Sequence, residues 1–347
     1  MKRTVLFVIL GSLITVFGFS QADLQPAAIV NLTKSEPITV KQLRTEVERL
    51  EKSAGRVMTQ SQRLEVLDLI INEKLVIQAA ERDRISISEN EINQQLQQLR
   101  NGMSQVLGRQ PTEAEFNQAV RSEFGLDPQA YREQLRRQMI AQKYLMAKKE
   151  DVLKSIKIPT EEEIRSEYFL RRSQIVRPDT VRFSMIQVPY GSDAASRAKA
   201  KEMADSLFRE IGSNPSKFDE VATRGQAPNS GYQAGDGGYL PRNPEAMSVV
   251  GQDFINTAFN LKQGEVSKLI EGKQGYQIVK ITENHLMKNL ELDDIAQLGT
   301  RITVRDYIGQ MMLNERQQAI LAQATQELVA ELRKGNPFRI FEQNLNW

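Results

Sequence analysis

Four helix starts are predicted from one pattern, a hydroxyl residue followed three positions later by Glu or Gln. The four pairs are Thr39 with Gln42, Ser88 with Glu91, Thr112 with Glu115, and Thr160 with Glu163. In such a capping box the hydroxyl accepts from the third helical N–H, and the Glu or Gln side chain accepts from the N–H of the cap. The pattern predicts that residues 39–172 are almost entirely helical, in six helices.

Apolar spacing and two short strands complete this first part. A long helix is expected from about Gln60 to Arg84, because its apolar residues recur at the spacing of a wide buried stripe. Those residues are Leu64, Leu67, Ile70, Ile71, Val76 and Ile77. Asp127 and Pro128 open a further helix, with proline at its first position. Before the helices, residues 27–32 form a strand candidate that can pair with residues 37–40.

The helical pattern stops at Arg177 and Pro178, because proline disfavours helix at the residue before it. Residues 181–284 are rich in strand signals. After them, Thr303 and Asp306 begin a helical run to Lys334, which residues 335–337 end. Its apolar residues, which are expected to be buried, include Tyr307, Met311, Ile320, Leu321, Leu328 and Leu332. The last segment, residues 339–347, is predicted to be a strand.

Composition excludes several kinds of chemistry. The chain has no cysteine, so disulfides, thiol catalysis and cysteine metal sites are excluded. Its one histidine, His285, excludes histidine clusters and is interpreted as a solvated residue at the end of a strand. Lys and Arg number 46 against 44 Asp and Glu, without the clustered basic excess that a nucleic-acid surface needs.

The first 22 residues have the pattern of a secretory signal. Lys2 and Arg3 precede an apolar stretch at residues 4–19, and Ser20 and Ala22 are small residues where a signal peptidase cuts. As a helix the stretch would span roughly 24 Å, short of the roughly 30 Å hydrocarbon core. We expect cleavage after Ala22, with 44 basic and 44 acidic residues left and no stable membrane insertion afterwards. An uncleaved anchor is the alternative.

Six segments between residues 181 and 280 resemble a parvulin, a small prolyl cis/trans isomerase. They are the strand 181–188, the helical stretches 198–211 and 218–222, the Gly-Asp-Gly-Gly turn in 235–240, residues 254–259, and the closing strand 275–280. The resemblance implies an FKBP-like α/β domain with a small antiparallel sheet. It also implies that Asp236 is structural, while Asp219 and Glu220 are interpreted as exposed helix residues.

The residues that active parvulins use are replaced here. The resemblance places Met185 and Gln277 where the family usually has histidines, and Ala227 or Pro228 where it has Cys or Asp. Methionine offers only a weak acceptor sulfur, and glutamine cannot ionise. We therefore expect little or no isomerase activity.

An apolar cup for a prolyl or aromatic side chain is expected to survive in part. Val250 stands at the family's Met position, and Phe254 at its ring-contacting Phe. Met247 and Tyr239 are candidates to line the same cleft, which would make it a peptide-binding module. The alternative is that these side chains only pack the domain.

The order of helical block, parvulin domain and long C-terminal helix resembles the SurA-type periplasmic chaperones. The strand pair at 28–39, the helix at 63–75 and the segment 85–88 that leads into the next helix resemble that family separately. The fold class expected is α+β, with a mainly helical chaperone domain built from N- and C-terminal segments. The expected parts are 1–22 signal peptide, 23–177 helical domain, 178–284 parvulin-like domain, and 285–347 a C-terminal helix and strand that complete the helical domain.

The expected function is that of a periplasmic, ATP-independent chaperone that binds unfolded secreted or outer-membrane proteins. No cofactor, metal or nucleic-acid partner is expected, and the glycine-rich residues 231–238 lack the Gly-Lys-Ser/Thr ending of a nucleotide-binding loop. Two alternatives stay open: an active prolyl isomerase with a different residue set, and an envelope assembly factor with one fixed partner.

Overall fold

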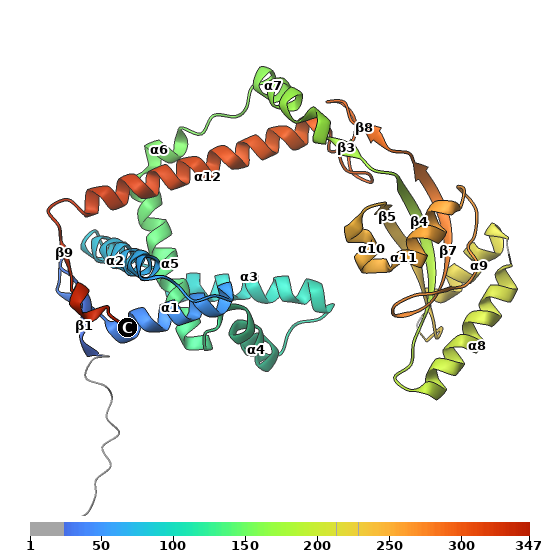
Figure 1. Ribbon diagram of the computed structural model, residues 1–347, viewed down its shortest axis with the longest axis horizontal. Helices are drawn as coiled ribbons and strands as arrows, with labels where there is room; N and C mark the ends of the chain where they lie inside the picture. Colours follow the sequence, from blue (N-terminus) through green and yellow to red (C-terminus); the bar gives the residue numbers. More distant parts are fainter. Residues whose placement is uncertain (1–23, 213, 228) are drawn as a thin grey trace, which may run out of the picture. The chain divides into compact units, whose positions relative to one another are not determined.

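The computed structural model describes residues 24–212, 214–227 and 229–347, so the predicted signal segment lies outside the described residues. The described chain divides into two compact units. The helical unit holds the described residues up to Ile156 together with Arg316–Trp347, and the sheet unit holds Lys157–Glu315. The α+β fold class is confirmed (Figure 1).

The helical unit is built from both ends of the described chain. Its first part contains β1 (Pro26–Val30), β2 (Glu36–Thr39), α1 (Val40–Ala54), α2 (Gln60–Arg82), α3 (Glu89–Leu107), α4 (Glu113–Phe124), α5 (Pro128–Lys148) and α6 (Glu150–Lys154). Its last part contains the C-terminal portion of α12 (Val304–Leu332), then β9 (Phe338–Ile340) and the 3₁₀ helix η3 (Glu342–Asn344). The predicted pairing of the first two strands is confirmed.

One apolar core joins these two parts. Leu67, Ile71 and Leu75 of α2 are fully buried, and they share a cluster with Leu328 and Leu332 of α12. β9 adds an edge to the small sheet by pairing antiparallel with β1 (Figure 1), and the strand order is β2-β1-β9. The helical domain is therefore made of N- and C-terminal segments, as predicted.

Two details of the C-terminal segment differ from the prediction. The strand covers only Phe338–Ile340, and the chain then turns through η3, so residues 339–347 are not one strand. Tyr307 and Leu321 are 58% and 49% exposed, so not every apolar residue of α12 is buried. The reason is that the two portions of α12 belong to the cores of different units, and each portion buries only one of its faces. The remaining surface of the helix is exposed to solvent.

The predicted helix starts are confirmed by their hydrogen bonds. Thr39, Ser88, Thr112 and Thr160 each cap a helix through a complete capping box. Asp127 caps α5 ahead of Pro128. The described residues between 39 and 172 contain seven α-helices rather than six, because the five-residue α6 follows α5 after a break at Lys149.

The carboxylates of the capping boxes predict that the stability of the fold depends on pH. Hydrogen bonds from the Ser88 N–H and hydroxyl, and then Lys143, hold the pKa of Glu91 at about 2, below the ordinary 4.5. Arg109 and Thr112 hold the pKa of Glu115 at about 2 in the same way. A depressed folded-state pKa stabilises the fold above the unfolded pKa, so this stabilisation should be lost as pH falls from about 4.5 to about 2.

An NMR titration of the Glu91 and Glu115 carboxyl carbons measures this directly. Ser88→Ala should raise the pKa of Glu91 only part of the way, because the backbone N–H of residue 88 still donates. It should leave Glu115 unchanged. If Glu91 titrates near 4.5 in the unsubstituted chain, the capping box does not hold its carboxylate as described.

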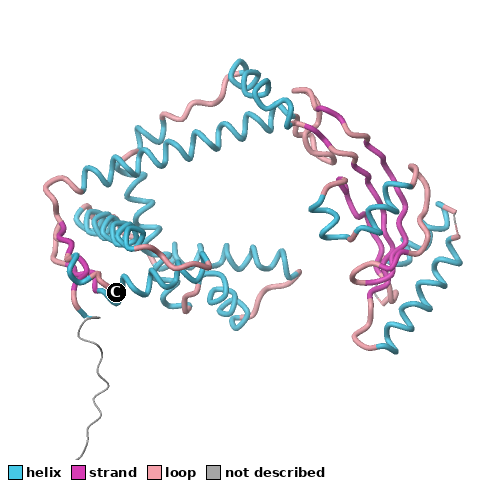
Figure 2. Tube along the Cα trace, viewed as in Figure 1, coloured by secondary structure: helices cyan, strands magenta, loops and turns pink. Residues whose placement is uncertain are grey.

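The sheet unit surrounds a four-stranded antiparallel sheet in the order β5-β4-β7-β6 (Figure 2). Its helices are α7 (Glu161–Arg171), the 3₁₀ helix η2 (Arg172–Gln174), α8 (Ala194–Ile211), α9 (Pro215–Gly225), α10 (Pro244–Val250) and α11 (Gln252–Asn260). Its strands are β3 (Val176–Arg177), β4 (Thr180–Pro189), β5 (Gln233–Pro241), β6 (Ile270–Glu271), β7 (Gly275–His285) and β8 (Lys288–Asn289). The N-terminal portion of α12 completes it.

The bounds of the sheet unit are wider than those of the predicted domain at 178–284. Tyr168 of α7 is buried with Leu290, Val304 and Ile308, and its hydroxyl donates to the Leu290 carbonyl at 3.1 Å. This small core attaches residues 157–177 and 285–315 to the sheet unit. Among the helices that the structure describes, none is long and apolar enough to cross a membrane.

Candidate functional site

The two faces of the sheet carry different apolar clusters. Helices α10 and α11 lie on one side of the sheet, and α8 and α9 on the other (Figure 1). Val181 and Phe183 of β4 join the cluster that contains residues of α10 and α11, whereas Ile186 and Val188 join the cluster that contains residues of α8 and α9. Side chains alternate along a strand, so Gln187 points to the same face as Met185. We call this side the α10/α11 face. It holds most of the positions that the sequence singles out.

The Gly-Asp-Gly-Gly sequence was expected to form a turn, but it lies within strand β5, where the pairing with β4 shifts register, and it shapes this face. A Cβ at Gly237 would lie 2.2 Å from the Phe183 ring, so only glycine leaves room for that ring. Gly238 has a φ of +76°, which glycine adopts without strain. Asp236 accepts from the Gly238 N–H at 2.9 Å and pairs with Arg182 at 2.6 Å. Asp236 therefore has the structural role expected for it.

Met185 and Gln277 occupy neighbouring places on the α10/α11 face. Met185 lies opposite Val279 and packs against the apolar cluster. Gln277 lies directly opposite Gln187, and its Nε2 is 3.5 Å from the Gln187 Oε1, at the limit of a hydrogen bond. The Gln277 Oε1 is buried, and no group in the described part of the chain donates to it. Two neutral carboxamides thus face each other beside a methionine.

The glycine beside this pair completes its surroundings. A Cβ at Gly272 would lie 2.5 Å from the Gln277 Oε1. Any other residue there would push the carboxamide aside. The next residue, Lys273, reaches the α10–α11 junction and donates to the Ser248 carbonyl. The turn between β6 and β7 therefore connects the carboxamide pair to the helices that carry the apolar cup.

The cup itself is largely a packed core. Phe254 is 2% exposed and meets Phe183 edge to face, with ring centroids 5.3 Å apart. Met247 and Val250 are half-buried and pack against the same cluster. The structure thus brings together Met185, Met247, Val250 and Phe254. The half-buried residues leave an apolar surface, while Phe254 mainly fills the interior.

Tyr239 does not join that group. It lies opposite Arg182 in the sheet, and its hydroxyl is 2.9 Å from Glu283 Oε2. Burial raises the pKa of Tyr239, and the hydrogen bond to Glu283 adds to this. Tyr239 points away from the α10/α11 face because it alternates with Leu240, which belongs to the apolar cluster. It is therefore a poor candidate for lining the cup.

His285 also differs from its interpretation as a solvated residue. It is the last residue of β7 and is half-buried, with Nε2 2.8 Å from Glu283 Oε2. Glu283 also accepts from Arg182 at 2.9 Å. His285 and Arg182 together lower the pKa of the Glu283 carboxyl.

Ala227 and the nearby acids lie outside the apolar cluster. Ala227 is exposed after α9 and lines a shallow pocket of about 310 Å³ with Pro189 and Gln233. Asp219 pairs with Lys280 at 2.7 Å, and Glu220 pairs with Lys217 at 2.6 Å. Both carboxylates form ion pairs on the α9 side of the unit. They do not lie on the α10/α11 face beside Met185 and Gln277.

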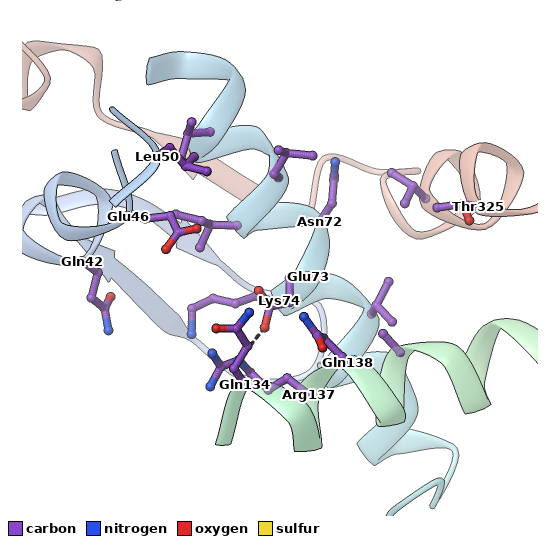
Figure 3. A pocket seen from close by; sticks show the side chains of 16 residues that line it. Gln42, Glu46, Leu50, Asn72, Glu73, Lys74, Gln134, Arg137, Gln138 and Thr325 are labelled. Atoms are coloured by element: carbon purple, nitrogen blue, oxygen red, sulfur yellow. Dashed lines mark hydrogen bonds and ion pairs between the residues drawn. The ribbon is translucent and has the colours of Figure 1, made fainter. Parts of the chain in front are cut away.

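A second concave surface lies in the helical unit. It is a cleft of about 600 Å³ lined by residues of α1, α2, α5 and α12 (Figure 3). Its apolar residues are Leu50, Val66, Leu69, Ile70, Val76, Ala141 and Val329. Its uncharged polar residues are Gln42, Asn72, Gln134, Gln138 and Thr325. Leu69 is 66% exposed, so part of this apolar surface is open to solvent.

Sequence reasoning missed Gln187 and this cleft. Gln187 could have been found, because the alternation along β4 puts it on the same face as Met185. The sequence indicated the cleft only weakly. The apolar stripe of α2 is wider than is needed for contact with one neighbouring helix. Which residues of α5 and α12 complete it depends on tertiary packing.

Comparison with known proteins identifies both units. Residues 1–145 match the SurA-like N-terminal domain family, and residues 159–297 match the PPIC-type PPIase domain family. The foldase protein PrsA of Clostridium botulinum is 23% identical over 304 residues, which cover 86% of this chain and 79% of PrsA. The chaperone SurA of Saccharophagus degradans is 24% identical over 277 residues, which cover 77% of this chain and 60% of SurA.

The chain also aligns with solved structures over most of its length, at low sequence identity and low TM-score. One, a SurA-like chaperone of Campylobacter jejuni, is 14% identical with a TM-score of 0.35, and covers 91% of this chain and 98% of its own. PrsA of Bacillus subtilis is 20% identical with a TM-score of 0.29, and covers 89% of this chain and 93% of its own. The two matches, in this order along one chain, identify it as a chain with a SurA-like N-terminal domain followed by a PPIC-type PPIase domain.

Proposed function

We propose that this protein is an ATP-independent chaperone that binds unfolded exported polypeptides, and that its PPIC-type domain holds prolyl segments with little or no turnover. The expected clients are secreted or outer-membrane proteins, and the expected compartment is the periplasm. The secretory pattern of residues 1–22 and the family support an extracytoplasmic place of action.

The observation that carries the proposal is the chemistry of the α10/α11 face. Met185 and Gln187 lie on one face of β4, with Gln277 of β7 opposite Gln187, and none of the three can ionise at neutral pH. The resemblance to parvulins suggests that a prolyl peptide would bind on this face. Prolyl isomerisation must cross a barrier of roughly 18–20 kcal/mol, which a polar network lowers by stabilising the twisted amide. The carboxamides can hydrogen-bond a peptide, and Met247 and Val250 offer apolar contact. The face thus retains means of binding and lacks the usual means of catalysis.

Kinetics with a short prolyl peptide test the catalytic half of the proposal. Each hydrogen bond lost from such a network is worth about 1–3 kcal/mol, or roughly 5- to 150-fold in rate. Because Met185, Gln277 and Ala227 stand at the three positions where the family has its polar residues, we expect turnover at least about 100-fold below that of an ordinary parvulin. The paired variant Met185→His with Gln277→His should recover part of it.

Suppression of client aggregation, followed by light scattering, tests the other half. We expect the unsubstituted chain to suppress aggregation and the paired histidine variant to do so equally well. An unsubstituted chain that turns over prolyl peptides like an ordinary parvulin, and loses this in Gln277→Leu, would instead establish the second candidate, an active isomerase. The family match of residues 159–297 is the observation that favours that candidate.

A further inference from the structure

The charged residues around the cleft of the helical unit are paired within the protein. Glu73 of α2 meets Arg137 of α5 at 2.5 Å, and the dashed line in Figure 3 marks this pair. Lys74 lies 3.5 Å from Glu36, and Glu46 pairs with Arg49 on the next turn of α1. Because each charge has a partner of opposite sign, the cleft presents no uncompensated charge to a ligand.

The carboxamides of the cleft, in contrast, are available. The side chains of Asn72, Gln134 and Gln138 have no hydrogen-bond partner among residues 24–212, 214–227 and 229–347. The Asn72 Oδ1 is moreover buried, and a buried acceptor without a donor is costly. Each carboxamide offers two N–H donors and a carbonyl acceptor. Gln134 and Gln138 are one helical turn apart on α5, so they line the cleft in a row.

We infer that this cleft binds an uncharged apolar stretch of polypeptide in extended conformation, with the carboxamides of Asn72, Gln134 and Gln138 bonding its main chain. This inference rests on the proposed chaperone function and names the part of a client that one surface takes. An extended chain presents unpaired N–H and C=O groups at short intervals, and a carboxamide can match either. A helix has satisfied these groups internally.

The apolar residues of the cleft fit the side chains of such a segment. Leu50, Val66 and Ile70 are partly buried, and exposed Leu69 extends the apolar surface. A charged side chain would gain nothing here, since the charges are already paired, and would lose hydration. The cleft is therefore expected to select segments without charged side chains. Its carboxamides bond the main chain of the segment, so binding should not depend on a particular sequence.

Fluorescence anisotropy with the full chain tests the inference. The probe is a labelled ten-residue peptide of Val, Leu, Ser and Gly with both ends blocked, compared with the same peptide N-methylated at alternate residues. We expect the N-methylated peptide to bind about tenfold more weakly, because its N–H donors are removed. Binding of the first peptide should change less than about twofold between 0.05 and 0.5 M salt, since screening acts on charge.

Substitutions locate the site. Asn72→Leu and Gln138→Leu should each weaken binding by about 2- to 12-fold, the range for one net hydrogen bond. Gln105→Leu is the matched control, because Gln105 is an exposed carboxamide on α3 that does not line the cleft. A thermal melt checks the fold, and Asn72→Leu should melt no lower than the unsubstituted chain, because it removes a buried unpaired acceptor.

Several outcomes would overturn the inference. They are equal binding of the N-methylated peptide, variants at Asn72 and Gln138 that bind like the Gln105→Leu control, or tighter and salt-sensitive binding of a charged peptide. The mass of the protein in solution could also be twice that of one chain and return to that of one chain when the peptide is added. This result would show that a second copy of the chain occupies the cleft instead. Failure of the unsubstituted chain to suppress client aggregation would refute the proposed function itself, which the peptide results alone do not.

Discussion

A chain that ends at Glu315 should lose the folded helical unit and keep the sheet unit. The deletion removes Leu328, Leu332 and Leu345, each at most 7% exposed within the helical core. At about 1.5–3 kcal/mol for each buried side chain, their loss amounts to about 5–9 kcal/mol, which is comparable to the whole stability of a domain. It also exposes the paired edge of β1 by removing β9.

Circular dichroism melting and limited proteolysis measure this result. Full-length protein should show one transition for each unit, and the shortened chain only the transition of the sheet unit. That unit should persist because Val304 and Ile308, which bury Tyr168, lie before the cut. The reciprocal control joins Ile156 to Arg316 through a flexible linker, and it should keep only the helical transition. A shortened chain that melts like the full one would show that the C-terminal segment is not part of the helical core.

Phe254→Ala should destabilise the sheet unit by about 3–5 kcal/mol, the usual cost of deleting a buried phenylalanine. The ring is 2% exposed, and it packs edge to face on Phe183 at the centre of the cluster under α10 and α11. For a unit of this size we expect the melting temperature to fall by roughly 10 °C. The transition of the helical unit should not move, because Phe254 has no part in its core.

The conservative variant Phe254→Leu distinguishes packing from peptide contact. Leucine keeps most of the apolar volume, so the sheet unit should remain folded with a smaller loss of stability. If Phe254 also contacts a prolyl ring, Phe254→Leu should weaken binding of a labelled prolyl peptide while the fold is retained. Unchanged melting in Phe254→Ala would contradict the burial described here.

The local elements could largely be predicted from the sequence. A capping box depends on two side chains three residues apart. Ser88 and Glu91 form the capping box that was expected of them. The same pattern is present at Thr59 and Gln62, which cap α2 in the structure but were not singled out in the sequence. These contacts are local, so neither partner depends on how the rest of the chain folds.

The site was predictable only in part. The substitutions at Met185 and Gln277 are visible in the sequence once the resemblance to parvulins is recognised, and their neighbouring places on one face follow from strand alternation. Tyr239 was expected near Phe254, yet it lies on the other side of the strand with Glu283. Its direction depends on the register between β4 and β5, where a bulge at Phe183 and Ser184 shifts the pairing.

The sequence by itself determined where the capped helices begin and that Met185, Gln187 and Gln277 cannot ionise at neutral pH. These properties belong to single residues or to neighbours within one turn. Only the tertiary structure decided that α12 supplies both cores and that Asn72 shares a cleft with Gln138. Partners so distant in sequence are brought together by the burial of apolar surface, which is non-directional, and their spacing along the chain does not record it.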